Sequence, residues 1–158
     1  MVRESLLEKM AQLDARNIGC AACVGTCCTF EKNSMRVTPR EARDITRHLA
    51  ATGRATDATR ALLRATIARF GLDRAEPGDG RRSFGRRRYT CPFFVERRCT
   101  IAPEAKPYGC LAFNARAPGV RDGENCASDQ NSLSALGVDS EATQDLPRAV
   151  LAALTEGT

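Results

Sequence analysis

Residues 20–28 read Cys-Ala-Ala-Cys-Val-Gly-Thr-Cys-Cys, which places four of the eight cysteines of the chain within nine residues. The two residues between Cys20 and Cys23 allow a tight turn to direct both sulfur atoms toward one point, as a metal site requires. Cys27 and Cys28 are neighbours, and the side chains of neighbouring residues in extended chain point apart. They therefore either bind two different metals, or only one of them binds a metal directly.

The other four cysteines are spread over the C-terminal half of the chain. If two metal sites exist, residues 20–28 cannot complete both, so the fold must bring the two halves together. The candidate metal ligands are all eight cysteines, namely Cys20, Cys23, Cys27, Cys28, Cys91, Cys99, Cys110 and Cys126.

Length and composition favour a metal over disulfides. The 158 residues predict a single domain over 1–158, yet the chain has only six Phe, two Tyr and no Trp with which to build a core. The N-terminal residues include acidic and basic side chains and no continuous apolar run, so they do not resemble a signal peptide. No apolar stretch is long enough to span a bilayer. We therefore expect a cytoplasmic protein with no membrane contact, in which clustered thiols stay reduced and act as ligands.

Helical spacing of apolar residues predicts helices over residues 5–16, 38–51, 56–70 and 142–154, and a short helix near 133–136. The second of these has a strong start signal. Thr38 can cap the helix, Pro39 suits its first turn, and Glu41 completes a capping box. Gly53 and Gly71 are expected to end the second and third helices.

The remaining segments predict little regular structure. Two strands over 84–95 and 99–101 form a β-hairpin, and residues 103–110 form a turn or short helix. Residues 30–37 are short and extended, while 72–82 form a surface loop and 111–131 are mostly irregular. The predicted fold is α+β and mainly helical, with one β-hairpin and irregular cysteine-rich loops organised around a metal site.

The full cysteine pattern resembles the YkgJ-type CxxCxxCC family of zinc- or iron-chelating domains. The segments that carry the resemblance are residues 20–28, Cys91-Pro92-Phe93-Phe94, Cys99-Thr100-Ile101 and Lys106-Pro107-Tyr108-Gly109-Cys110, and Cys126 matches a later cysteine of the family. The chain departs from that pattern in three places. Three residues separate Cys23 from Cys27 where the family has two, Lys106 replaces an arginine, and Leu111 follows Cys110 where arginine is usual. The resemblance covers about residues 17–127 and implies a core domain with flanking helices.

Thiolate ligands suit zinc and iron–sulfur clusters alike, so the identity of the metal stays open. A four-iron–four-sulfur (4Fe–4S) cluster could take Cys20, Cys23, Cys27 and one distant cysteine, but the usual C-x2-C-x2-C run is absent. Two zinc sites with four cysteines each would use all eight, and a site with an open coordination position would allow catalysis.

The function expected from the sequence is therefore metal binding, with zinc or iron as cofactor and a metal ion as partner. One alternative is an Fe–S-dependent redox or group-transfer enzyme, because the family resemblance extends to flagellin lysine N-methylases. Another is a protein-interaction module that zinc stabilises. The sequence identifies no catalytic residue and no protein partner.

A nucleic-acid partner is not expected. Seven arginines form the densest basic stretch of the chain, but few aromatic residues lie between them and no nucleic-acid motif is present. We expect a solvated hairpin and loop, or arginines that offset the negative charge of a thiolate cluster. The arginines are Arg81, Arg82, Arg86, Arg87, Arg88, Arg97 and Arg98. His48, the only histidine, is expected to be a surface or half-buried helix residue rather than a ligand.

Overall fold

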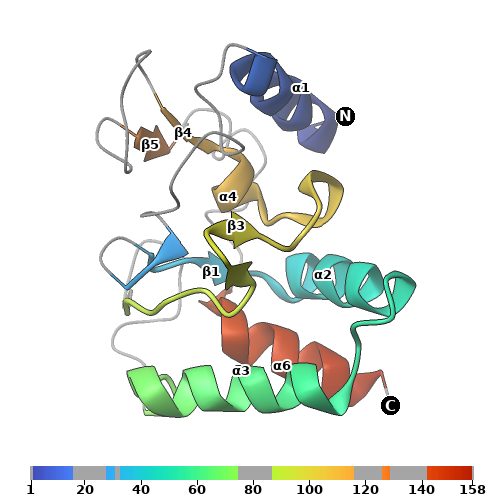
Figure 1. Cartoon of the computed structure of the whole chain (residues 1–158), viewed down its shortest axis with the longest axis vertical. Coiled ribbons are helices and arrows are strands. Elements are labelled where there is room, and N and C mark those ends of the chain that lie inside the picture. Colours follow the sequence, from blue (N-terminus) through green and yellow to red (C-terminus); the bar gives the residue numbers. More distant parts are fainter. Residues whose placement is uncertain are drawn as a thin grey trace.

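The computed structural model describes residues 2–15, 28–30, 33–74, 87–115, 126–128 and 142–157. These residues are mainly helical and include three antiparallel pairs of short strands, which agrees with the predicted α+β class. Figure 1 shows α2, α3 and α6 gathered at one end of the molecule, with α1, β4 and β5 at the other. None of the helices described is long and apolar enough to cross a membrane.

Three helices form the larger layer: α2 (Pro39–Ala51), α3 (Asp57–Phe70) and α6 (Leu146–Glu156). Both α2 and α3 pack against α6. Their buried apolar residues join residues of the hairpin region in one core, formed by Val37, Ala42, Ile45, Leu49, Leu63, Leu72, Tyr89, Phe93, Ile101, Ala105, Leu146, Ala149, Val150 and Leu154.

Helix α2 begins at the predicted capping box. The Thr38 hydroxyl accepts a hydrogen bond from the Glu41 amide at 3.2 Å, and the Glu41 carboxylate accepts one from the Thr38 amide at 2.7 Å. At the start of α3 the Thr56 hydroxyl accepts a hydrogen bond from the Thr59 amide at 3.3 Å, without a reciprocal bond, and α3 ends where Gly71 adopts a left-handed φ of 66°. The sequence therefore predicted both helices almost to the residue.

Helix α1 (Val2–Ala15) packs on the short helix α4 (Tyr108–Leu111) in a second, smaller apolar cluster. Arg3 fastens α1 to the rest of the molecule. One of its guanidinium nitrogens pairs with Asp44 at 3.0 Å, and the other donates to the backbone oxygen of Lys106 at 2.6 Å. The members of the cluster are Leu6, Met10, Leu111 and Ala112.

The described strands form three antiparallel pairs, of which the first connects the most distant parts of the chain. They are β1 (Arg36–Val37) with β6 (Gln144–Asp145), β2 (Phe94–Val95) with β3 (Arg98–Cys99), and β4 (Phe113–Ala115) with β5 (Cys126–Ser128). In the first pair Arg36 lies opposite Asp145. The predicted hairpin is present, but its turn is only Glu96 and Arg97, both with the positive φ typical of a two-residue hairpin loop. The 3-10 helix η3 (Pro103–Ala105) and α4 confirm the turn or short helix expected over 103–110.

Several boundaries differ from the prediction. The last helix begins at Leu146 rather than 142, because residues 144–145 pair with β1 and a proline occupies the first turn of α6. Strands β4 and β5 lie in a stretch predicted to be irregular, and the strand predicted over 84–95 is reduced to Phe94–Val95 among its described residues. The helix predicted near 133–136, and residues 75–82 of the predicted loop, lie outside the described residues.

A buried cluster of charges joins the ends of these elements. The side chains of Arg36 and Asp145 are completely buried and lie 3.5 Å apart. Arg87 pairs with the second oxygen of Asp145 at 2.6 Å and donates to the backbone oxygens of Gly71, Leu72 and Arg74. Arg36 also donates to the hydroxyl and the backbone oxygen of Thr143. One carboxylate thus holds two arginines from distant segments.

We predict that Asp145→Asn lowers the free energy of unfolding by about 3–5 kcal/mol, because it leaves buried arginine charge without its counter-ion. Urea denaturation followed by circular dichroism measures the change. Asp57→Asn is the matched control, since the fully exposed Asp57 pairs with Arg60 at 3.3 Å on the surface of α3. Its loss should cost less than about 1 kcal/mol. Equal effects of the two substitutions would contradict the structural role of Asp145.

Candidate metal centre

The end of the cysteine-rich stretch runs beside the segment that leads into the hairpin. The backbone amide of Cys91 donates to the oxygen of Cys28 at 2.8 Å, and the amide of Phe30 donates to the Thr90 hydroxyl at 3.0 Å. The amide of Tyr89 donates to the Asn33 oxygen at 3.1 Å, so the two segments run in opposite directions. These bonds bring Cys28 and Cys91 together from the two halves of the chain.

Tyr89 fixes the position of this segment from inside the core. Its side chain is completely buried, and its hydroxyl donates to the backbone oxygen of Met35. Asn33 reinforces the contact, because its side-chain amide donates to the Tyr89 oxygen at 3.0 Å while its carbonyl accepts from the Met35 amide. Tyr89 therefore fastens the strip of chain that carries Cys91.

The electrostatic surroundings of Tyr89 show that a third cysteine is near. Burial raises the pKa of Tyr89 well above its ordinary value, and the neighbouring Cys91, Cys110 and Asp145 raise this pKa further. Because the effect of one charge on another falls with distance, Cys91 and Cys110 lie near the same buried hydroxyl. Cys91 and Cys110, far apart in sequence, therefore both act on the pKa of one buried hydroxyl.

Helix α4 positions Cys110. The first helical residue, Tyr108, donates its backbone amide to the Glu41 carboxylate at 2.9 Å. No side chain of the preceding residue, Pro107, caps this helix. Glu41 is completely buried, and its other oxygen accepts from the amide and hydroxyl of Thr38. One buried carboxylate therefore satisfies amide groups at the starts of both α2 and α4.

Two further predicted ligands lie on short strands. Cys126 lies in β5 opposite Ala115, the last residue of β4, so the register places Ser128 rather than Cys126 at the end of β4 that follows α4. Cys99 lies in β3 opposite Phe94, whose amide donates to the Cys91 oxygen at 3.1 Å. The Cys99 side chain is exposed, and its sulfur lies 3.7 Å from the backbone oxygen of Ile101.

Among the described residues, no three Cys, His, Asp or Glu side chains are grouped closely enough to hold a metal ion. Cys20, Cys23 and Cys27 lie outside the described residues. The described cysteines therefore do not form a complete coordination sphere among themselves. Thiolate sulfur is a suitable donor for zinc and for iron–sulfur clusters, so the chemistry of these donors fits either predicted cofactor.

His48 has a structural contact in place of a metal ligand role. Its Nε2 atom accepts a hydrogen bond from the backbone amide of Ala102 at 3.4 Å, just before η3, and the residue is half-buried in α2. This agrees with the expectation that it is a half-buried helix residue.

The basic stretch is not uniformly solvated. The expectation of a solvated hairpin and loop is wrong for Arg87, which is mostly buried and pairs with Asp145, because this carboxylate from the far end of the chain reaches it. Arg88 is exposed, and so are Arg97 and Arg98 in the hairpin. The arginines at 81, 82 and 86 lie outside the described residues.

Sequence analysis missed two residues that position the cysteines, Tyr89 and Glu41. The capping box identified Glu41 as a helix start, but its contact with α4 depends on a segment far along the chain. Tyr89 is one of only two tyrosines, and nothing in its local sequence distinguishes a buried anchor from a strand residue.

Comparison of the chain with protein-family models, with curated proteins and with solved structures found no match.

We predict that Glu41→Ala increases the alkylation rate of Cys110 about fivefold or more, because loss of a helix cap costs about 1 kcal/mol and α4 then opens more often. Mass spectrometry of iodoacetamide-treated protein measures the rate at each cysteine. Thr38→Val is the matched control, since it removes the Thr38 cap of α2 and leaves the contact between Glu41 and Tyr108. The same acceleration in both variants would show that Glu41 acts only through α2.

Proposed function

We propose that this protein binds a metal through its clustered cysteines, as zinc or as an iron–sulfur cluster. The observation that carries the proposal is the approach of three predicted ligands from separate segments. Cys28 and Cys91 touch through a backbone hydrogen bond of 2.8 Å, and Cys110 lies with Cys91 near Tyr89. Cys28 also directly follows Cys27, so the remaining thiols of the stretch over 20–28 are attached to this same region by a short length of chain.

The surrounding structure supports a site that is held from several sides. The hydroxyl of Tyr89 and the carboxylate of Glu41 are both buried and hydrogen-bonded, and each fixes a segment that bears a cysteine. Such supporting contacts orient the ligands of metal sites and limit the motion of the donor atoms. Membership in the YkgJ-type family, with its single-domain architecture, is part of the same proposal.

Two other functions are compatible with a metal bound by these cysteines. One requires an open coordination position at the metal, and the other requires a metal that is purely structural. In the first, an iron–sulfur centre supports redox or group-transfer chemistry, and in the second, zinc stabilises a surface for a protein partner. Metal analysis and the visible spectrum of protein purified without oxygen distinguish them. Stoichiometric zinc in a colourless protein favours the structural alternative, and stoichiometric iron with inorganic sulfide favours the redox alternative.

We predict that Cys91→Ser and Cys110→Ser each lower the bound metal by half or more, because serine is a poor substitute for a thiolate ligand. Inductively coupled plasma mass spectrometry of the purified variants measures the ratio of metal to protein. Cys99→Ser is the comparison variant, since its sulfur is exposed on the hairpin. Equal loss in Cys99→Ser would extend the centre to the hairpin, while full metal content in both Cys91→Ser and Cys110→Ser would contradict the proposal.

Metal removal should loosen one part of the molecule more than another. Binding of a structural metal contributes folding free energy, but the core between α2, α3 and α6 is built from apolar residues. After removal by a chelator, we expect faster hydrogen exchange over residues 87–115 and smaller changes in α3 and α6. Hydrogen exchange with mass spectrometry checks this, with chelator-treated Cys91→Ser as control. An equal increase in the exchange rate throughout the chain would show that the helical layer also depends on the metal.

A further inference from the structure

Two phenylalanines from distant segments stack on each other where Phe70, half-buried against the core, meets the exposed Phe30. The ring centroids of Phe30 and Phe70 lie 5.6 Å apart, with 18° between the ring planes. The guanidinium carbon of Arg88 lies 5.4 Å from the Phe30 centroid, and that of Arg69 lies 5.3 Å from the Phe70 centroid. Phe30 is nevertheless 49 % exposed, so a large part of this ring faces solvent.

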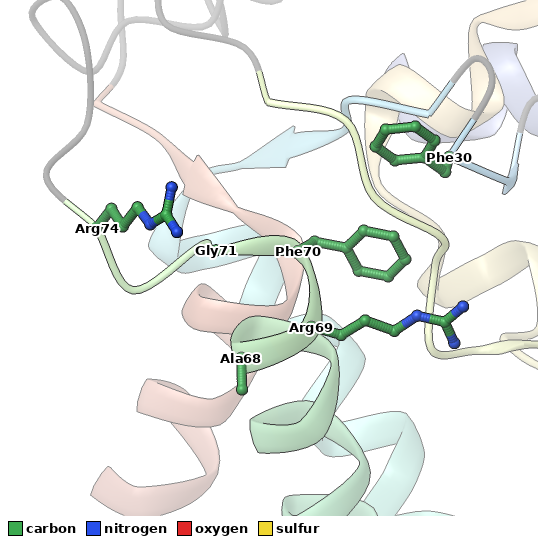
Figure 2. Close-up of a pocket in the computed structure, with 6 residues that line it drawn as sticks. All are labelled: Phe30, Ala68, Arg69, Phe70, Gly71 and Arg74. Atoms are coloured by element: carbon green, nitrogen blue, oxygen red, sulfur yellow. The ribbon is translucent and has the colours of Figure 1, made fainter.

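A hollow of about 410 Å³ lies against these rings at the end of α3. Figure 2 shows Phe30 and Phe70 close together, with Arg69 beside Phe70 and Arg74 on the other side of Gly71. The lining contains no acidic side chain. It is formed by Phe30, Ala68, Arg69, Phe70, Gly71 and Arg74. These residues together with Arg88 are named the aromatic–arginine surface.

The charges of Arg69 and Arg74 on this surface are available to a ligand. Carbonyl groups at a helix C-terminus attract cations, and such an attraction would compete with an anionic ligand for the arginines. Here Arg87 already donates to the oxygens of Gly71 and Leu72. Arg69 and Arg74 form no ion pair with any part of the chain that the structure describes. The hollow therefore favours a ligand with negative charge.

We propose that the aromatic–arginine surface binds single-stranded nucleic acid, with a base against Phe30 and phosphates against Arg69 and Arg74. Bases stack on aromatic rings and on guanidinium planes, and arginine pairs with phosphate oxygens through a planar fork. An acidic polypeptide would match the charge but would leave the exposed ring without a flat partner. This site is inferred independently of the proposed metal function, although Phe30 follows Cys28 by two residues.

The sequence did not indicate such a site because its parts are scattered. Phe30, Phe70 and Arg88 come from three segments, and only the fold places an arginine over each ring. The chain also carries a net charge of +5, which favours encounter with a polyanion. The expectation that nucleic acid is not a partner was based on a run of arginines in the sequence, of which this surface includes only Arg88.

Fluorescence anisotropy of the full chain with a labelled oligothymidylate of about twelve nucleotides tests the proposal. We expect binding that weakens with salt between about 50 and 200 mM. Phe30→Leu keeps an apolar side chain and removes the ring, and should weaken binding about fivefold or more. An abasic oligonucleotide of the same length should bind weaker than oligothymidylate by a similar factor.

Paired arginine variants separate this surface from general positive charge. Replacing Arg69 and Arg74 by Gln together should reduce the slope of log affinity against log salt by about 1.4, since each single-strand phosphate contact contributes about 0.7. The control replaces Arg43 and Arg64 by Gln, which removes the same charge from exposed positions on α2 and α3. This control should keep the slope of the unmodified protein.

Three results would overturn the proposal. Absence of binding at about 50 mM salt would exclude a nucleic-acid site. Equal slopes for the two double variants would show that binding depends on the net charge of the protein and not on this surface. Polyglutamate that competes as well as unlabelled oligothymidylate, with no effect of Phe30→Leu, would identify an acidic polypeptide as the ligand. Circular dichroism and metal content of each variant exclude loss of fold or of the metal centre as the cause.

Discussion

The carboxylate of Asp145 lies between two arginines, and the arrangement of the described elements depends on this contact. Arg36 belongs to β1, while Arg87 reaches the end of α3 through three backbone oxygens and leads toward Cys91. Charges buried this deeply gain little net stability over apolar packing, but they allow few alternative arrangements. The pair β1–β6, the end of α3 and the segment leading to the hairpin therefore adopt one relative placement.

Local signals predicted the helices well because the interactions that start and end a helix lie within a few residues. The capping box at Thr38 and the left-handed Gly71 are of this kind. Strands of two or three residues carry no such pattern, since their pairing partner lies far along the chain. Nothing in the sequence indicated that Arg36 and Arg87 are buried, because arginines in an arginine-rich chain are expected at the surface. Their burial depends on the ion pairs with Asp145, which lies far along the chain.

For the candidate site, the sequence indicated which residues have the right chemistry and left their geometry undetermined. Sulfur donors can be recognised from residue type and spacing, whereas the contact between Cys28 and Cys91 depends on two segments aligned by Tyr89 and Asn33. The position of Cys110 depends on Glu41, whose second hydrogen bond crosses from α2 to α4. Cys99 has the expected neighbours in sequence, yet its exposed hairpin gives it less support than the other described cysteines.

The packing of α6 has a consequence for synthesis on the ribosome. Helices α2 and α3 bury their apolar faces against α6, and Asp145 immediately precedes it, so both helices and the arginines that pair with Asp145 emerge before these partners. Until then the nascent chain keeps open apolar faces and unpaired arginines, a state prone to misassembly. Vectorial synthesis thus leaves an interval in which Arg87, four residues before Cys91, has no counter-ion, and the emergence of Asp145 ends it.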